Sequence, residues 1–503
     1  MTVAATTDAL ADLEVDLLVL PLSSRPAAPR VEALARPLGD SLRRAVEDFD
    51  GETGTSVLVY PEADAVPRIA LVGLGDPAEL DRERLRQGAA AGAQAAIDRT
   101  AASVACIVPP ADLNDGIIAQ ALVEGLILGG YRYRRYRTDD DAPDLESILL
   151  HVAGDVDRAA VRDGIDTGTA LARATCTARD LVNTSPHDKT ARQFAATIRE
   201  SGDRHGYDVD TWGEDRIREE GFGGLLAVNR GSFEPPTFSL LTWRPDHAVN
   251  TRPIVLAGKG VVFDTGGLSL KDTKGSMDMM KADMGGAAAV VGAFEALADL
   301  NVPLHVVGLI PASDNRPGNK AYVPGDVIQI HSGATVEVMN TDAEGRLLLA
   351  DALSYAQSLD PRLVIDLATL TGSQVVALGA DAAAVMTSET EDAAERLYAI
   401  QRAGERSGDR VHPLPMYDAY KQHLDSSVAD LKNVGGSEAG AITAGKFLEH
   451  FTGEAPWLHL DIAGPAFLTQ PKPYRPEGGT GFGVRLLLTY LNDAVTIRQN
   501  RDS

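Results

Sequence analysis

The chain has 503 residues, 44% of them apolar, and a formal charge of −25 at pH 7. This length exceeds what one hydrophobic core usually organises, so we expect two domains. The acidic excess repels phosphate backbones and anionic membrane surfaces, which makes nucleic-acid binding an unfavoured function. The two cysteines, Cys106 and Cys176, lack the spacing of a zinc finger or a disulfide framework.

The first residues predict neither a secretory signal nor a membrane anchor. Residues 1–20 carry four acidic side chains and no basic segment before an apolar run. No stretch reaches the ~20 uninterrupted apolar residues that a membrane-spanning helix requires. We therefore expect a cytoplasmic protein without a membrane partner.

Short apolar runs ended by Gly, Pro or Asp predict buried strands in the first third of the chain, at 15–20, 56–60, 69–74, 103–108 and 148–152. Between them, Asp76 and Pro77 are typical of a helix start, and an Ala-rich pattern predicts a helix to about Ile97. The basic-aromatic and acidic stretch at 131–143 predicts an exposed loop. This part of the chain is therefore an expected α/β domain with a mixed sheet, residues 1–155.

A long helical pattern at 156–183 predicts a helix that connects the two domains. Beyond it, the patterns alternate between strands and helices, with strands at 254–256, 304–310 and 363–367 and helices at 286–300 and 347–358. Such alternation is typical of an α/β sheet covered by helices on both faces. We expect residues 184–503 to form a larger catalytic domain with a mixed, mostly parallel sheet.

Several familiar motifs are absent or incomplete. Residues 440–446 begin like a phosphate-binding loop, but Phe447 stands where a hydroxyl must reach Mg²⁺. The sequence contains no HExxH pair and no GxSxG elbow. His459 and Asp461 would point the same way from a strand, and we favour a structural hydrogen-bonding role for them over metal ligation.

Charged residues among paired glycines form the first candidate site. Lys259, Asp264, Lys271 and Asp283 follow a buried strand within twenty-five residues. Glycine permits backbone to approach closely where a side chain would clash, and open α/β sheets place ligands at the ends of strands. These features predict a binding site.

A second segment places Asp342 and Glu344 just before a helix that begins near Gly345. Hard oxygen ligands gathered in this way suit divalent cations. Helix capping or a salt-bridged loop would explain either segment alone, and the two segments together favour a metal site.

The segments GKGVVFDTGGLSLK, MKADMGG, NTDAEGRL, DLATLTG and HLDIAG resemble the signature segments of the leucine aminopeptidase (cytosol aminopeptidase) family. The resemblance covers residues 181–491, and the NTDAEGRL octapeptide is its most specific part. It implies an aminopeptidase that releases N-terminal amino acids, preferentially Leu and other apolar residues, by two-metal activated water attack. It also implies two metal sites. The ligands of one metal would be Lys259, Asp264, Asp283 and Glu344. The ligands of the other would be Asp264, Asp342 and Glu344, with the backbone carbonyl of Asp342 as a further ligand.

The same resemblance implies that Lys271 and Arg346 are catalytic, the lysine polarising the scissile carbonyl and the arginine holding a bicarbonate. Four carboxylates can balance two dications, so Lys259 can ligate as a neutral amine while Lys271 stays protonated. By resemblance, the first side chain of the substrate lies in a mostly apolar pocket lined by Met280, Asn340, Ala343, Thr369, Gly372, Ala463 and Ala466.

Three other functions stay open on the sequence alone. A two-metal phosphoesterase would use similar ligands but would recruit more basic side chains. Some family members also bind DNA, which the net charge disfavours here. A Ser269/Lys271 hydrolase dyad would need no metal. We expect Mn²⁺ or Zn²⁺, with Mg²⁺ or Co²⁺ as alternatives, peptide substrates with a free N-terminus, and a homohexamer arranged as a dimer of trimers.

Overall fold

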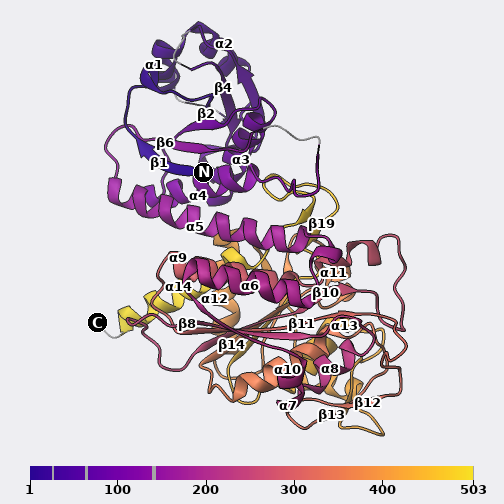
Figure 1. Ribbon diagram of the computed structural model, residues 1–503. Coiled ribbons are helices and arrows are strands. Elements are labelled where there is room, and N and C mark those ends of the chain that lie inside the picture. The colour runs from indigo at the N-terminus through magenta and orange to yellow at the C-terminus, as the bar shows by residue number, and fades with distance from the viewer. Residues whose placement is uncertain (25, 27, 63–65, 139–142, 502–503) are drawn as a thin grey trace. The chain divides into compact units, whose positions relative to one another are not determined.

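The computed structural model describes residues 1–24, 26, 28–62, 66–138 and 143–501 and divides the chain into two compact units (Figure 1). Unit 1 comprises Met1–Cys176 and Gln470–Glu477, and unit 2 comprises Thr177–Thr469 and Gly478–Ser503. The division falls within helix α5 (Arg158–Asn183). The return of a short C-terminal segment to unit 1 has no counterpart in the predicted boundaries.

Unit 1 is an α/β unit, and its described residues contain a six-stranded sheet in the order β1-β6-β5-β2-β4-β3. The strands are β1 (Thr2–Thr6), β2 (Leu17–Leu22), β3 (Ser56–Val59), β4 (Ile69–Gly73), β5 (Ser103–Ile107) and β6 (Ser147–His151). All neighbours are parallel except β3 and β4, so the sheet is mixed as expected. The five predicted strands are present. Strand β1 was not predicted, because its partly exposed edge position does not require an apolar run.

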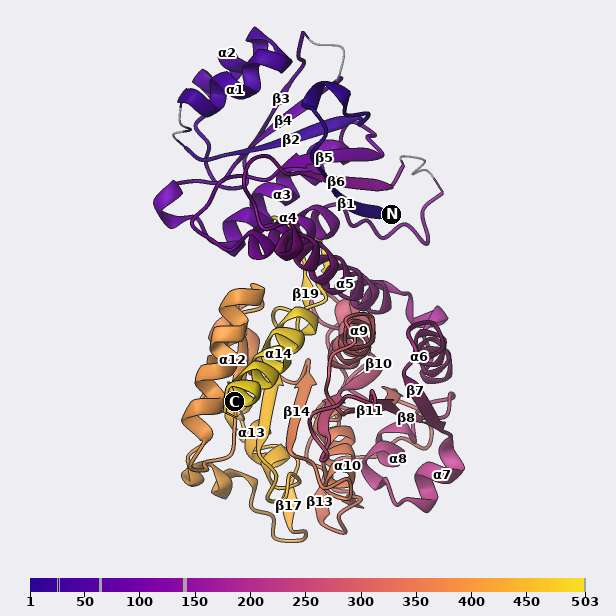
Figure 2. The same ribbon diagram turned by 90° about the vertical axis from the view of Figure 1, so that its left-hand side faces the viewer.

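Strand β2, in the interior of this sheet, is buried on both faces. Leu17 and Val19 pack in the core with α3 (Arg82–Ile97) and α4 (Asp115–Gly129). Leu18 and Leu20 belong to the opposite core, with side chains from α1 (Ala28–Leu38) and α2 (Asp40–Asp48). Since successive strand residues point to opposite faces, a strand buried on both sides must be apolar throughout (Figure 2).

Two details of unit 1 differ from the predictions. Asp76, the predicted start of the helix, caps only a 3-10 helix, Pro77–Glu79. Helix α3 begins after a second capping residue, Asp81, whose carboxylate accepts a hydrogen bond from Arg84 N. The segment Gln470–Glu477 joins this unit through buried Tyr474, whose hydroxyl donates to Glu83 at 2.9 Å. Residues 131–138 and 143 carry no helix or strand, as predicted, and 139–142 lie outside the described residues.

Unit 2 contains, in its described residues, a nine-stranded mixed sheet whose main path is β16-β15-β18-β14-β9-β11-β8-β7, with β10 beside β11. Strands β11, β9, β14 and β18 run parallel, and β7, β8 and β15 supply the antiparallel pairings. The strands are β7 (Asp208–Trp212), β8 (Thr237–Trp243), β9 (Ile254–Gly258), β10 (Gly260–Asp264), β11 (Val306–Asn315), β14 (Leu363–Ala368), β15 (Ala383–Met386), β16 (Val411–Pro413) and β18 (Trp457–Asp461).

Helices cover both faces of this sheet, as expected for the fold class. Helices α6 (Ala191–His205) and α9 (Gly285–Asp299) pack on one face, and α8 (Gly223–Asn229) and α10 (Gly345–Gln357) on the other (Figure 1). The remaining helices are α7 (Glu214–Glu219), α11 (Gly372–Leu378), α12 (Ala393–Ser407), α13 (Gly440–Glu449) and α14 (Val484–Arg501). Among the described residues, no helix has the length and apolar character needed to cross a membrane.

Smaller elements complete unit 2. A three-stranded sheet contains β12 (Val327–Gln329), β13 (Thr335–Glu337) and β17 (Leu431–Lys432), and a two-stranded one contains β19 (Phe467–Leu468) and β20 (Gly478–Gly479). A 3-10 helix, η4 (Met277–Ala282), precedes α9.

Residues 260–264, which follow the strand predicted at 254–256, form a further strand, β10. Val261 and Val262 are buried, and residues of β10 pair with the end of β11. A Cβ on Gly260 would lie 2.5 Å from Pro311 O, so only glycine allows the two backbones to approach this closely. Strand β10 thereby carries Asp264 to the same edge of the sheet as the ends of β9 and β11.

Candidate metal centre and active site

The candidate residues gather at the carboxyl ends of the parallel strands in unit 2. Lys259 follows β9, Asp264 ends β10, and Thr369 follows β14. Asp283 precedes α9, and Glu344 precedes α10. Because the carboxyl ends of parallel strands meet at one edge, residues far apart in sequence come together here.

Three carboxylates form the centre of the cluster. Oxygen atoms of Asp264, Asp342 and Glu344 all lie within 4.8 Å of one another. Asp283 joins them through Lys259, whose Nζ lies 2.6 Å from Asp283 Oδ1 and 2.9 Å from Glu344 Oε1. The structure therefore brings together all five residues that the sequence suggested as metal ligands.

The two lysines hold different parts of the cluster. Lys259 Nζ also donates to the carbonyl of Thr369 at 3.0 Å. Lys271 Nζ lies 2.8 Å from Asp264 Oδ2 and 2.6 Å from Asp342 Oδ1. Lys259 is 3% exposed, whereas the side chain of Lys271 is 14% exposed, so Lys271 lies nearer to solvent.

Burial and mutual repulsion perturb the carboxylates. Burial and the charge of Glu344 raise the pKa of Asp264 to about 7, and burial raises the pKa of Asp283 and of Asp342 as well. Burial also opposes the charge of Glu344, but Lys259 and Lys271 lower its pKa below the usual value. Crowded, desolvated carboxylates of this kind gain most from a bound cation.

Unpaired oxygens provide a direct test of whether a cation fits. Asp283 Oδ2 and Glu344 Oε2 are buried and have no hydrogen-bond partner within the described part of the chain. Leaving a buried charged oxygen unpaired is costly, and a divalent cation removes that cost. The donor set of carboxylates and one amine suits a divalent metal ion.

The cationic side chains of the site are buried or partly buried beside carboxylates. Burial disfavours the ammonium groups of Lys259 and Lys271, but the surrounding carboxylates raise the pKa of both above the ordinary value. Arg346, in the first turn of α10, is 7% exposed, and burial lowers its pKa to about 10. One guanidinium nitrogen of Arg346 donates to Asn433 O at 2.6 Å, and its Nε has no partner among the described residues.

One backbone N–H and one side-chain amide orient the carboxylate of Asp264. Its Oδ1 accepts from Gly266 N at 2.7 Å and from Asn315 Nδ2 at 2.8 Å. The same Asn315 nitrogen donates to Thr341 O at 2.9 Å, as does the hydroxyl of Tyr322 at 2.8 Å. Thr341 Oγ1 in turn donates to Gly266 O. These bonds connect the two sequence segments.

Gly345 allows the octapeptide to lie against the first segment. A Cβ at this position would lie 2.3 Å from Lys259 Cε and 2.7 Å from its Nζ. A glycine is therefore required between Glu344 and Arg346 for the amine of Lys259 to reach the carboxylates.

The predicted specificity residues lie on the elements around the cluster. A Cβ built on Gly285 would lie 3.3 Å from Ala466 Cβ and 3.4 Å from Thr369 Cγ2, so Ala466 and Thr369 both lie beside Gly285. Thr369 Oγ1 also donates to Asp283 at 2.8 Å. The other predicted pocket residues are Met280 in η4, Asn340 and Ala343 in the octapeptide, Gly372 at the start of α11, and Ala463 after β18.

Asp461 connects two of the loops that carry these residues. It is fully buried, and its Oδ1 accepts from Leu370 N at 3.1 Å and from Ala463 N at 3.2 Å. Its Oδ2 accepts from Thr371 Oγ1 at 2.6 Å. His459 Nδ1 lies 2.6 Å from Asp366 Oδ1. Both residues make the structural hydrogen bonds favoured from the sequence.

Sequence reasoning missed Asn315, Tyr322 and Asn433. Asn315 ends strand β11, which runs five residues past the predicted end at residue 310, so the sequence pattern did not show that Asn315 lies at the carboxyl end of the strand. Tyr322 and Asn433 lie in irregular segments, where the one-dimensional pattern gives no signal either.

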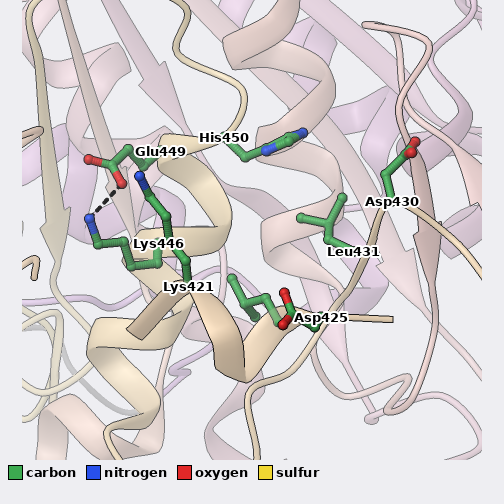
Figure 3. A pocket seen from close by; sticks show the side chains of 8 residues that line it. Lys421, Asp425, Asp430, Leu431, Lys446, Glu449 and His450 are labelled. Atoms are coloured by element: carbon green, nitrogen blue, oxygen red, sulfur yellow. Dashed lines mark hydrogen bonds and ion pairs between the residues drawn. The ribbon is translucent and has the colours of Figure 1, made fainter. Parts of the chain in front are cut away.

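The segment 440–446 that begins like a phosphate-binding loop has a different role. Lys446 lies within α13 and pairs with Glu449 at 2.8 Å, at the wall of a cavity of about 270 Å³ (Figure 3). Lys421, which also lines this cavity, pairs with Asp418 at 2.7 Å. These lysines are neutralised by neighbouring carboxylates and do not form a phosphate site.

Two models of one protein family match most of the chain. Residues 176–488 match the model of the cytosol aminopeptidase family, catalytic domain, and residues 21–140 match that of the family's N-terminal domain. A relative from Roseiflexus castenholzii named "Probable cytosol aminopeptidase" is 42% identical over 95% of this chain and 96% of its own length. One of the same name from Chloroherpeton thalassium is 41% identical over 98% of this chain and all of its own length.

Solved structures show the same fold. The bottromycin maturation enzyme BotP in complex with Mn is 36% identical, with a TM-score of 0.84 over 95% of this chain and 99% of its own. A mutant of tomato leucine aminopeptidase is 31% identical, with a TM-score of 0.87 over 98% of this chain and 96% of its own. The chain therefore belongs to the cytosol aminopeptidase family and is a metal-dependent aminopeptidase.

Proposed function

We propose that this aminopeptidase uses two divalent cations to release N-terminal amino acids, preferentially Leu and other apolar residues. One cation would be held by Lys259, Asp264, Asp283 and Glu344, and the other by Asp264, Asp342 and Glu344. The observation that carries the proposal is the convergence of four carboxylates and two lysines at the sheet edge, with buried carboxylate oxygens that lack a partner among the described residues.

Two divalent cations would supply Lewis-acid polarisation and a bound water of lowered pKa. The chain supplies positive charge for the oxyanion that forms when a peptide carbonyl is attacked. Lys271, whose pKa is raised by its carboxylate neighbours, stays protonated and can donate to that oxygen. Lys259, the more buried lysine, would instead ligate as a neutral amine, because a bound dication would favour its deprotonated form over the charged form that the carboxylates alone favour. The two lysines thus take opposite protonation states in the working site.

Arg346 provides the second positive charge. Its buried guanidinium has an Nε without a partner in the described part of the chain, which suits a small anion, and we propose bicarbonate there. Such an anion would accept and return a proton during hydrolysis. Arg346 itself would fix the anion and compensate its charge.

The preference for apolar N-terminal residues would come from the mostly apolar set of Met280, Ala343, Ala463 and Ala466, together with Thr369. An apolar pocket separates similar side chains by only about 1–3 kcal/mol, so we expect broad activity with Leu and Met favoured. The free amine of the substrate can complete the coordination of one cation, which would restrict cleavage to the N-terminus.

The deciding experiment compares leucine p-nitroanilide, N-acetyl-leucine p-nitroanilide and p-nitrophenyl phosphate with Mn²⁺ as the added metal. Hydrolysis of the first substrate alone is expected, and its loss on chelation would exclude a Ser269/Lys271 dyad. Cleavage of the phosphate ester instead would identify a two-metal phosphoesterase. Mn²⁺ is the first metal to test because a related solved structure contains it. Add-back of Zn²⁺, Mg²⁺ or Co²⁺ to stripped enzyme then ranks the metals.

We also propose a cytoplasmic homohexamer arranged as a dimer of trimers, acting on peptides with a free N-terminus and binding no nucleic acid. The names of the relatives, which include the word cytosol, support the location. Light scattering would measure the number of subunits in the assembly. A DNA gel shift that persists at physiological salt would contradict the proposal that the protein binds no nucleic acid.

A further inference from the structure

A buried asparagine from a distant segment holds the octapeptide. Asn433 directly follows β17 and is fully buried. Its side-chain oxygen accepts from Met339 N at 2.8 Å and from Asn340 N at 3.3 Å. Its side-chain nitrogen donates to Asn340 O at 2.7 Å and to Ala343 O at 3.5 Å. All four of these hydrogen bonds are therefore with the backbone around Asp342.

The backbone of Asn433 reaches the other end of the same segment. Its carbonyl accepts from Arg346 at 2.6 Å, and its N–H donates to Glu337 O at 2.9 Å. One residue thus contacts the chain before, within and after the octapeptide's two carboxylates. Pairing of β13 with β17 places it there.

Only an amide side chain fits this arrangement. Backbone N–H groups and backbone carbonyls face it together, so it must offer an acceptor and a donor, which Asn does. An aspartate would keep the acceptor and lose the donor, and an alanine would lose both. The opposite side of the segment is held separately, because Asn315 and Tyr322 bind the carbonyl of Thr341.

We propose that Asn433 is a positioning residue for the aminopeptidase reaction, which sets the backbone around Asp342 and the guanidinium of Arg346 through the hydrogen bonds described above. The inference rests on the proposed roles of Asp342 and Arg346. Displacement of catalytic groups by about 1 Å can cost up to 10²-fold in rate, so a loosened segment should reduce turnover strongly.

The test compares Asn433→Ala with a matched buried asparagine in the same unit. Asn250 is 4% exposed, and its side chain likewise binds backbone, donating to Arg252 O and His305 O and accepting from His305 N, each at 2.9 Å. It lies before β9, at the opposite edge of the sheet from the site. Asn250→Ala therefore removes a similar set of bonds without touching the octapeptide.

Three quantities are measured on the full-length, Mn²⁺-loaded chain: kcat and KM for leucine p-nitroanilide, Mn²⁺ affinity, and amide hydrogen exchange of peptides spanning 338–347. For Asn433→Ala we expect kcat to fall about tenfold or more with a smaller change in KM, and exchange at 339–343 to accelerate. Mn²⁺ affinity should fall several-fold because Asp342 is held less firmly. Asn250→Ala should match the wild type in all three. If Asn433→Ala does not fold, Asn433→Asp, which keeps the acceptor and replaces the donor with a carboxylate oxygen, is judged by the same criteria.

An unchanged kcat in Asn433→Ala, or an equal loss in Asn250→Ala, would overturn the proposal. A lower kcat with wild-type exchange at 339–343 would also overturn it, because the effect would not pass through the segment. Failure of the proposed function has a different signature: a wild type that neither binds Mn²⁺ nor hydrolyses the substrate overturns both.

Discussion

Gly345 separates Glu344, a proposed metal ligand, from Arg346, and replacing it with alanine tests how tightly the two sequence segments are packed. The new Cβ would lie 2.3 Å from Lys259 Cε, whereas ordinary contact begins near 3.4 Å, so the lysine end must move by about 1 Å. Lys259 Nζ makes contacts of 2.6, 2.9 and 3.0 Å to Asp283, Glu344 and the Thr369 carbonyl. A shift of that size breaks most of them.

Two opposing effects decide the outcome of Gly345→Ala. Alanine gains up to about 1 kcal/mol in helix propensity at the start of α10. Each lost hydrogen bond to a charged group costs about 1.5–3 kcal/mol, so the loss at Lys259 outweighs the gain. With its amine displaced, the chain should bind Mn²⁺ about 10- to 100-fold more weakly, which is about 1.4–2.8 kcal/mol.

The assay is a Mn²⁺ titration followed by calorimetry or by the electron paramagnetic resonance signal of free Mn²⁺, with kcat measured at saturating metal. Gly213→Ala is the control, because Gly213 precedes helix α7, has an ordinary backbone conformation, and a Cβ there meets nothing within 4 Å. The control should bind Mn²⁺ as the wild type does. Wild-type Mn²⁺ affinity in Gly345→Ala would refute the assignment of Lys259 as a ligand.

Three further predictions concern the lysine, the metals and pH. Lys271→Ala should lower kcat by about 10² or more while the Mn²⁺ content stays at the wild-type value, and an unchanged kcat would rule out its role at the oxyanion. Chelation should abolish hydrolysis of leucine p-nitroanilide and Mn²⁺ should restore it; activity that persists in a metal-stripped sample contradicts a metal-dependent mechanism. Burial raises the pKa of Asp351 from a usual 3.8 to about 7, although the hydrogen bonds that its carboxylate accepts from backbone N–H groups act to lower the pKa. Because the folded state then holds a proton that the unfolded chain has released, this contribution to stability is present below pH 3.8 and is lost as pH rises through about 7. Melting temperatures from about pH 5 to 8 should fall more steeply for the wild type than for Asp351→Asn, and parallel curves would show that Asp351 does not titrate in this range.

Local patterns in the sequence were sufficient for the fold class and for the residues that gather at the strand ends. Apolar runs marked the buried strands, because a strand covered on both faces has no polar position to interrupt it. Lys259, Asp264, Lys271 and Asp283 could be recognised because they lie close together in the chain among glycines. The pairing of residues 260–264 with β11 could not be predicted in this way, because it depends on a partner strand about fifty residues away in the sequence.

The octapeptide could be identified from its own residues, but the residues that hold it in place could not be identified from the sequence. Asp342 and Glu344 have the chemistry of cation ligands, and together with the first segment they indicate a metal site. Asn433 is an ordinary asparagine in the sequence, and it becomes the residue that holds the octapeptide only because β17 pairs with β13. Asp461 likewise connects two loops only because β14 and β18 lie side by side. The sequence by itself determined which side chains can do the chemistry, since that is a property of each residue, whereas the tertiary structure decided which buried groups orient them, since those contacts join segments brought together only by folding.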